Sequence, residues 1–178
     1  IVGGSIVIKE NKEYAEKISY IQNAVGAIPS PFDCYLLTRS IKTLSVRMKQ
    51  HNENAIAVSN FLTNHSKINK VFFPGIDERY KEVAAKQMDG FGGMMSFILD
   101  TNIDGVKSFL KNLNIFTLAE SLGGVESLIE HPAIMTHASI DPAIREKLGI
   151  SDTLLRISVG IEDVEDLIAD LDQALSKI

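Results

Sequence analysis

Apolar residues recur at helical spacing in several stretches of the chain. In the first stretch, residues 11–27, the apolar positions lie three or four residues apart, which places them on one face of a helix. These positions are Tyr14, Ile18, Ile21 and Val25. Gly26 follows them as a helix stop signal. The same spacing predicts further helices over residues 79–88, 102–113 and 160–178.

Other stretches are short apolar runs, or alternate between apolar and other residues, as strands do. In residues 88–100, for example, Met95, Phe97 and Leu99 occupy every second position. A β-branched run over residues 5–8 follows two glycines and predicts a buried strand after a turn. Further strands are predicted within residues 67–75, 116–122 and 154–160. Strands interleaved with helices predict an α/β or α+β fold.

Residues 31–65 contain no glycine or proline after Pro31, so we expect a long helical segment there. Ser30 is a candidate N-cap, with Pro31 in the first helical position and Asp33 three residues after the cap. The segment is predicted to form one long helix, or two with a break near the polar residues 50–54.

Composition narrows the classes of protein that fit. A hydrophobic content of 45% allows a substantial core, and a net charge of −5 argues against a nucleic-acid-binding surface. No apolar stretch approaches the roughly 20 residues that cross a bilayer. The lone Cys34 fits a reduced intracellular compartment, so we expect a cytoplasmic protein.

The chain opens with IVGG, the tetrapeptide at the mature N-terminus of trypsin-like proteases. A protease of that class needs a serine in a GDSGG context, which this sequence lacks, and disulfides that one cysteine cannot form. The sequence has no initiating Met and begins inside a strand-like run. We therefore expect it to be the C-terminal piece of a longer protein.

Arg156 is the most informative polar residue, because it interrupts an apolar strand pattern. Leu155, Ile157 and Val159 are predicted to share one face, which leaves Arg156 and Ser158 on the other. Such an arginine either forms a structural ion pair or grips the carboxylate of a ligand with its planar fork. The pattern leaves both possibilities open.

Glu120 and Ser121 are predicted to end a strand just before Gly123-Gly124, on a turn that can approach a ligand closely. The glycines lack the spacing of a known phosphate-binding loop. His131 and His137 lie six residues apart with no cysteine near them, so we expect no metal site.

Three segments together resemble the Cys/Met-metabolism family of pyridoxal-phosphate enzymes. They are AESLGGVESLIEHPAIMTHAS, LLRISVGIEDVEDLIADLDQAL and PSPFDCYLLTRSIKTLSVRM. The resemblance implies the C-terminal part of a fold-type I enzyme, like aspartate aminotransferase, with a small α/β domain built on an antiparallel sheet. It further implies that residues 1–30 end the large cofactor-binding domain, residues 31–65 form a connecting helix region, and residues 66–178 form the C-terminal α/β domain.

The resemblance also implies pyridoxal 5'-phosphate as the cofactor, an amino-acid substrate and a homotetramer. Arg156 would bind the substrate α-carboxylate, and Ser121 would help to hold it and the cofactor lysine. Glu120 would lie at the distal end of the substrate, and Thr136 would line the same pocket. The family's Schiff-base lysine would lie upstream of Ile1, so the chain would carry no catalytic residue itself.

Within the family, HPAIMTHAS and LGISDTL resemble the γ-lyase branch, which cleaves the Cγ–S bond of cystathionine. AESLGGVESL and MTH also occur in the γ-synthase branch and do not separate the two. A methionine γ-lyase, or an α/β interaction domain that has kept the fold without the lysine, is the remaining alternative.

Overall fold

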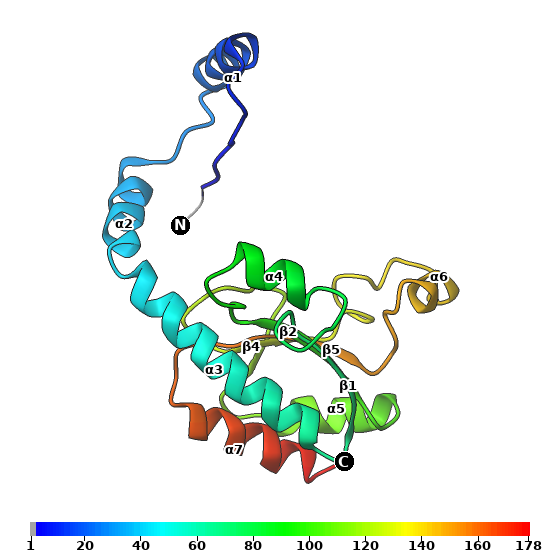
Figure 1. Cartoon of the computed structure of the whole chain (residues 1–178). Coiled ribbons are helices and arrows are strands. Elements are labelled where there is room, and N and C mark those ends of the chain that lie inside the picture. The colour runs from blue at the N-terminus through cyan, green and yellow to red at the C-terminus, as the bar shows by residue number, and fades with distance from the viewer. Residues whose placement is uncertain (1–2) are drawn as a thin grey trace. The chain divides into compact units, whose positions relative to one another are not determined.

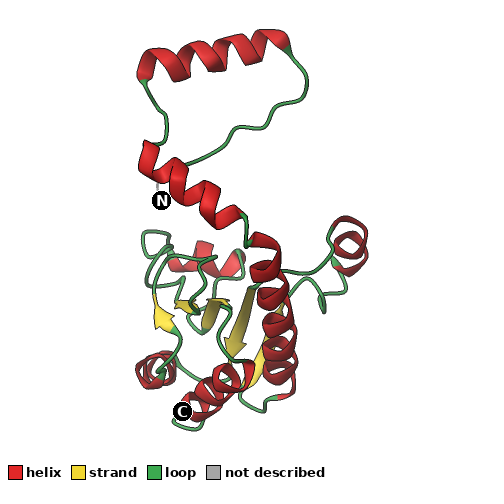
Figure 2. Ribbon diagram, turned by 90° about the vertical axis from the view of Figure 1, so that its left-hand side faces the viewer, coloured by secondary structure: helices red, strands yellow, loops and turns green. Residues whose placement is uncertain are grey.

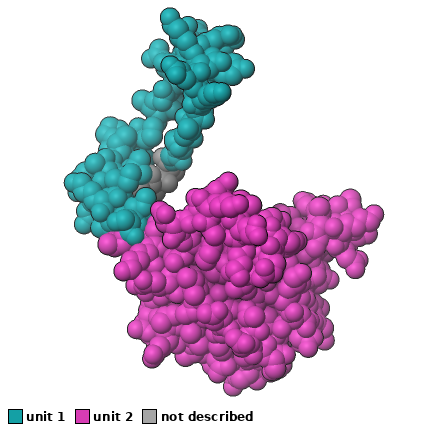
Figure 3. All heavy atoms as spheres, in the orientation of Figure 1, with its two compact units in different colours: residues 1–45 teal, residues 46–178 magenta. Residues whose placement is uncertain are grey.

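The computed structural model describes residues 3–178, so Ile1 and Val2 of the opening IVGG lie outside the described residues. The chain divides into two compact units, Ile1–Ser45 and Val46–Ile178, coloured teal and magenta in Figure 3. Each unit is described here by itself.

The first unit contains helices α1 (Lys12–Val25) and α2 (Pro31–Ile41), and the end of α1 and the start of α2 lie where the sequence predicts. Gly26 adopts a left-handed conformation with φ of 73° and closes α1. The Ser30 hydroxyl accepts the backbone N–H of Asp33 at 3.1 Å, which confirms the predicted cap of α2.

The strand predicted over residues 5–8 is absent, which corrects that prediction. The segment lies outside regular structure and is exposed, with Val7 92% accessible. A β-branched run becomes a strand when a neighbouring strand accepts its backbone hydrogen bonds. Within residues 3–178 no strand pairs with this segment.

Helix α3 (Leu44–Asn64) follows α2 after a break at residues 42–43. The break predicted near residues 50–54 was therefore placed too late. The helix continues through these polar residues, and two of them, His51 and Asn54, are buried and bonded to backbone carbonyls. The His51 imidazole donates from Nδ1 to Val159 O at 2.7 Å, and Asn54 Nδ2 donates to Gly160 O at 3.0 Å.

The second unit is built on a five-stranded sheet in the order β1-β2-β5-β4-β3. The strands, yellow in Figure 2, are β1 (Ile68–Phe72), β2 (Met94–Leu99), β3 (Thr117–Leu118), β4 (Leu128–Glu130) and β5 (Leu154–Ser158). Three of the four pairings are antiparallel, and β3 pairs with β4 in parallel. The predicted α/β fold is confirmed, and the sheet is mixed but mostly antiparallel.

Helices cover this sheet unequally. Figure 1 shows α3, α5 (Ile103–Asn112) and α7 (Val164–Leu175) on one face and α4 (Lys81–Gln87) on the other. The core forms under the three helices, where the side chains of Phe97, Leu155 and Ile157 are fully buried. Burying each such side chain stabilises the fold by roughly 1.5–3 kcal/mol. This confirms that Leu155 and Ile157 share the core face of β5.

Two short elements were not predicted, namely β4 and helix α6 (Pro142–Lys147). They span three and six residues, too few for a periodic pattern to stand out. The predicted strand over residues 116–122 is also shorter in the structure, because β3 ends at Leu118.

Candidate functional site

Arg156 lies in the middle of β5, on the sheet face opposite the main core. Its neighbours in register are Ser96 on β2 and Glu130 on β4. The side chain is 25% exposed, so the guanidinium is partly accessible to solvent. The sequence pattern thus predicted its strand and face correctly.

Glu130 is the charge that faces this arginine. Its side chain is 1% exposed, and its Oε2 forms an ion pair with Arg156 Nη1 at 2.5 Å. The Thr136 hydroxyl donates to Glu130 Oε1 and lies 2.7 Å from His137 Nδ1. A buried carboxylate without a partner would be strongly unfavourable, so Arg156 and Thr136 make this burial possible.

The other end of the guanidinium contacts the loop after β3. Arg156 Nη2 donates to the carbonyl of Glu120 at 2.8 Å, and the carbonyl of Ser121 lies at 3.5 Å. These contacts use main-chain oxygens, while both residues are exposed. The chain leaves the sheet before Glu120, so this residue and Ser121 lie on a loop and not at a strand end as predicted.

This loop is anchored to the last residue of β5 and to the chain segment that follows it. The Ser158 hydroxyl accepts the Gly123 N–H at 2.8 Å, and Ile161 N–H donates to Val125 O at 2.9 Å. Gly123 has φ of 77°, a conformation that glycine adopts without strain. The loop is therefore fixed just after the residues that contact Arg156.

The structure brings all four predicted site residues together. Glu120 and Ser121 reach Arg156 through their carbonyls, and Thr136 reaches it through Glu130. The structural ion pair considered for Arg156 exists, and carboxylate binding stays a prediction. Glu130 was missed by the sequence reasoning. The available signal was a lone carboxylate after the apolar pair Leu128-Ile129, within a strand too short to recognise.

The two histidines of this region make different contacts: His137 lies beside the Thr136 hydroxyl, and His131 contacts the main chain. His131 is fully buried, and its Nε2 donates to the Asp152 carbonyl at 2.9 Å. Burial lowers the pKa of His131, which favours the neutral imidazole. Residues 3–178 contain no group of three or more His, Cys, Asp or Glu side chains placed to hold a metal ion.

Gly123-Gly124 does not enclose a phosphate-sized ligand. A Cβ added at Gly123 would meet nothing within 4 Å, so the loop is open at this point. Phosphate loops instead wrap backbone N–H groups around the anion. We therefore assign no phosphate contact to this glycine pair.

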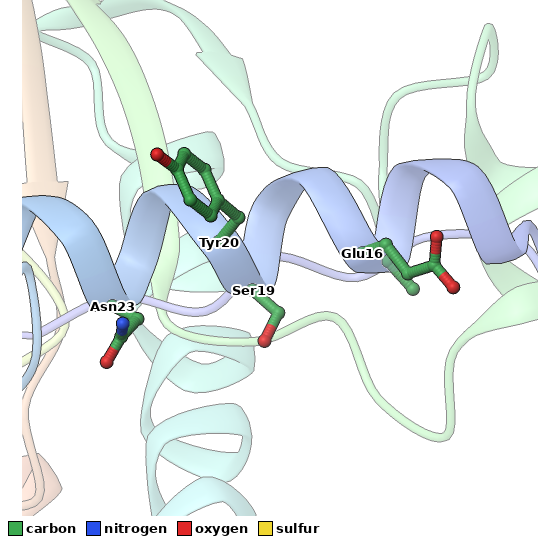
Figure 4. Close-up of a pocket in the computed structure, with 5 residues that line it drawn as sticks. Glu16, Ser19, Tyr20 and Asn23 are labelled. Carbon is green, nitrogen blue, oxygen red and sulfur yellow. The ribbon is translucent and has the colours of Figure 1, made fainter.

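A hollow beside α1 is lined by Ala15, Glu16, Ser19, Tyr20 and Asn23. Figure 4 shows that Tyr20 and Ser19 project in different directions from the helix. Ligand sites have walls that converge on the ligand from more than one element, so we do not consider this hollow a candidate. Within the described part of the chain, none of the helices combines the length and apolar character that a bilayer crossing requires.

Comparison of the sequence with known proteins identifies one family. The sequence profile of the Cys/Met metabolism PLP-dependent enzymes matches residues 1–176. The chain is 53% identical over 173 residues to a cystathionine gamma-lyase of Dictyostelium discoideum, covering 97% of this chain and 45% of the relative. It is 51% identical over 176 residues to a cystathionine beta-lyase of Coxiella burnetii, covering 98% and 46%.

Solved structures agree with the sequence relatives. A cystathionine gamma synthase from Xanthomonas oryzae pv. oryzae, in complex with aminoacrylate and cysteine, aligns with a TM-score of 0.86 at 47% identity. The alignment covers 94% of this chain and 43% of that one. The chain thus spans less than half the length of the proteins that it matches.

Proposed function

The chain belongs to the Cys/Met metabolism family of pyridoxal-phosphate-dependent enzymes, and from this premise we propose that it is the C-terminal portion of a cystathionine gamma-lyase. The proposed reaction cleaves the Cγ–S bond of L-cystathionine with the uptake of one water. The products are L-cysteine, 2-oxobutanoate and ammonia.

The observation that carries the proposal is the position of Arg156. Its guanidinium is a partly exposed cation, oriented by protein contacts at both terminal nitrogens. A guanidinium binds a carboxylate through two parallel hydrogen bonds, and every amino-acid substrate carries an α-carboxylate. In the proposed enzyme Arg156 binds this carboxylate and fixes the orientation of the substrate Cα–H bond.

The other site residues are proposed to act around this contact. Ser121 helps to hold the carboxylate end of the substrate, and Glu120 lies toward the distal end of the substrate chain. Thr136 lines the same pocket. The exposure of all three side chains supports these roles, because an exposed side chain remains free to contact a ligand.

The family's cofactor is pyridoxal 5'-phosphate, whose ring takes up the electron pair released when the Cα–H bond breaks. We propose that the lysine that holds it belongs to the remainder of the longer protein. The part played by residues 3–178 is then to bind and orient the substrate.

Two alternatives have specific support. Relatives at about 50% identity include a cystathionine beta-lyase, and a similar solved structure is a cystathionine gamma synthase. Product analysis of the full-length protein with cystathionine separates these reactions. Cleavage at Cγ gives 2-oxobutanoate and cysteine, whereas cleavage at Cβ gives pyruvate and homocysteine. A synthase would instead form cystathionine from cysteine and an activated homoserine ester, and either of the last two results would overturn the proposal.

We also propose that the full-length protein is a cytoplasmic homotetramer. The family resemblance supports the assembly. The side chains of Val7, Tyr20 and Val25 are each more than 70% exposed, which leaves apolar surface for the remainder of the protein or for another subunit to cover. Light scattering of the full-length protein tests this proposal, and a monomeric mass at micromolar concentration would contradict it.

A further inference from the structure

Glu130 is a buried carboxylate to which the proposed function assigns no role. It lies on β4 directly opposite Arg156 in the strand pairing, and its side chain is 1% exposed. Oε1 accepts the Thr136 hydroxyl, and Oε2, which has no hydrogen-bond partner among the described residues, lies in an ion pair with Arg156 Nη1. The carboxylate therefore holds a fixed position beneath the arginine.

The contacts of Arg156 fix its guanidinium at two places. Glu130 holds Nη1 from the buried side, and the carbonyl of Glu120 holds Nη2 from the loop side. A guanidinium has five N–H donors in one plane. These protein contacts occupy some of them, so donors remain for a second carboxylate while the plane of the group is already set.

Orientation matters here because an arginine side chain gives up rotamer entropy when it is fixed. A guanidinium held only by the loop carbonyls would have to be ordered when the ligand binds. Ordering it in advance lowers that cost. The opposing effect is that the negative charge of Glu130 weakens the attraction of Arg156 for another anion. Since Glu130 lies on the buried side and Arg156 remains partly exposed, pre-orientation is expected to outweigh this repulsion.

We propose that Glu130 is a positioning residue, which holds the Arg156 guanidinium in the orientation that binds the α-carboxylate of the substrate. This inference rests on the proposed role of Arg156. It assigns the substrate-binding function of the site to a pair of residues on adjacent strands.

The test compares two ligands that differ in the carboxylate alone. L-alanine has no leaving group on its side chain, so elimination cannot follow binding, and ethylamine is the same molecule without the carboxylate. Their affinities are measured with the full-length protein loaded with pyridoxal phosphate, from the change in cofactor absorbance. The ratio of the two affinities reports the carboxylate contact and cancels general losses of stability.

In Glu130→Gln the side chain keeps its size and loses its charge. We expect the preference for L-alanine over ethylamine to fall about tenfold, by analogy with removal of the residues that orient metal ligands. Asp170→Asn is the matched control, because Asp170 is also a buried carboxylate but accepts hydrogen bonds from the loop at residues 114–116. This control is expected to lower the melting temperature and leave the preference unchanged.

If folded, cofactor-loaded Glu130→Gln kept the full preference for L-alanine over ethylamine, the proposal would be overturned and Glu130 would have a purely structural role. An increased preference would also overturn it, because it would show that Glu130 competes with the ligand for Arg156. Where that variant does not load the cofactor, Glu130→Asp replaces it, because the shortened carboxylate no longer reaches Nη1. A preference equal to that of the unsubstituted protein would overturn the proposal there too. Arg156→Lys separates this inference from the proposed function. If its preference also stays unchanged, the carboxylate assignment of Arg156 itself fails.

Discussion

Asp170 anchors the loop between α5 and β3, and its replacement by asparagine should destabilise the protein strongly. Its carboxylate, 4% exposed on α7, accepts three backbone N–H groups. Oδ1 accepts from Asn114 at 2.8 Å, and Oδ2 accepts from Ile115 at 2.8 Å and from Phe116 at 3.1 Å. An asparagine retains one acceptor oxygen and presents an NH₂ group to the remaining donors.

The expected loss follows from these contacts. A hydrogen bond to a charged group contributes about 1.5–3 kcal/mol, and a buried donor left without a partner costs about 1–3 kcal/mol. Asp170→Asn loses at least one such bond and the charge on the others, so we expect a loss of about 3 kcal/mol in the free energy of unfolding. For a protein of this size that lowers the melting temperature by roughly 6–12 °C.

The pH dependence gives a second, independent signature. Burial alone would raise the pKa of Asp170, but the N–H donors of residues 114–116 and Gln173 outweigh it and lower the pKa below its ordinary value of 3.8. A carboxyl with a lowered pKa in the folded state stabilises the protein above its ordinary pKa, and this stabilisation is lost as the pH falls through the folded-state pKa. The difference in melting temperature between the unsubstituted protein and Asp170→Asn should therefore narrow below about pH 3.8.

Thermal unfolding followed by circular dichroism at pH 7 and pH 3 measures both effects. Asp172→Asn on the same helix is the control, because the Asp172 side chain is 65% exposed and exposed ion pairs contribute little. Two results would refute the reasoning. One is that Asp172→Asn lowers the melting temperature as much as Asp170→Asn does. The other is that the difference in melting temperature between Asp170→Asn and the unsubstituted protein is the same at pH 3 as at pH 7.

Three further outcomes are expected. In the full-length protein, Arg156→Lys should lower kcat/KM for cystathionine by about two to three orders of magnitude, because lysine lacks the bidentate fork of arginine. Steady-state kinetics on the folded, cofactor-loaded variant measure this loss. A near-normal kcat/KM would contradict the assignment of Arg156 to the substrate carboxylate. The 178 residues alone should form no borohydride-reducible adduct with pyridoxal phosphate, since the Schiff-base lysine is expected elsewhere, and a stable adduct detected by mass spectrometry would disprove this. Gly160→Ala should lower the free energy of unfolding by about 1–3 kcal/mol, because the new Cβ collides with Val125 O. Gly4→Ala is the control, because a Cβ at Gly4 meets nothing within 4 Å, and it should change the free energy of unfolding little. A denaturant titration measures both variants.

Local signals in the sequence account for much of the observed fold. The caps of α2 and α1 depend on contacts within a few residues, such as that between Ser30 and Asp33, and were predicted correctly. The strand β2 was recognisable because its alternation continues over six residues. The strand predicted at residues 5–8 was wrong because a strand also needs a partner, which the local pattern does not supply.

The candidate site was predictable to a lesser degree. The face on which Arg156 lies follows from the period of two along β5, but its pairing with Glu130 depends on β4 lying beside β5. These residues are 26 positions apart in the sequence, and no local pattern specifies their contact. The roles implied for Glu120, Ser121 and Thr136 came from the family resemblance. Their proximity to Arg156 came from the structure.

The pairing of Arg156 with Glu130 across adjacent strands also bears on how the sheet is assembled. Slipping a strand by one residue turns every side chain to the opposite face. A slipped β5 would drive the guanidinium under α3, α5 and α7 and would leave Glu130 facing Leu155 or Ile157. Both changes bury a charge without a partner. A slipped register therefore costs more free energy here than the same slip would cost in a strand with only apolar side chains. The ion pair between Arg156 and Glu130 thus favours the native register of β5 against β4, the same register that places the arginine proposed to recognise the substrate.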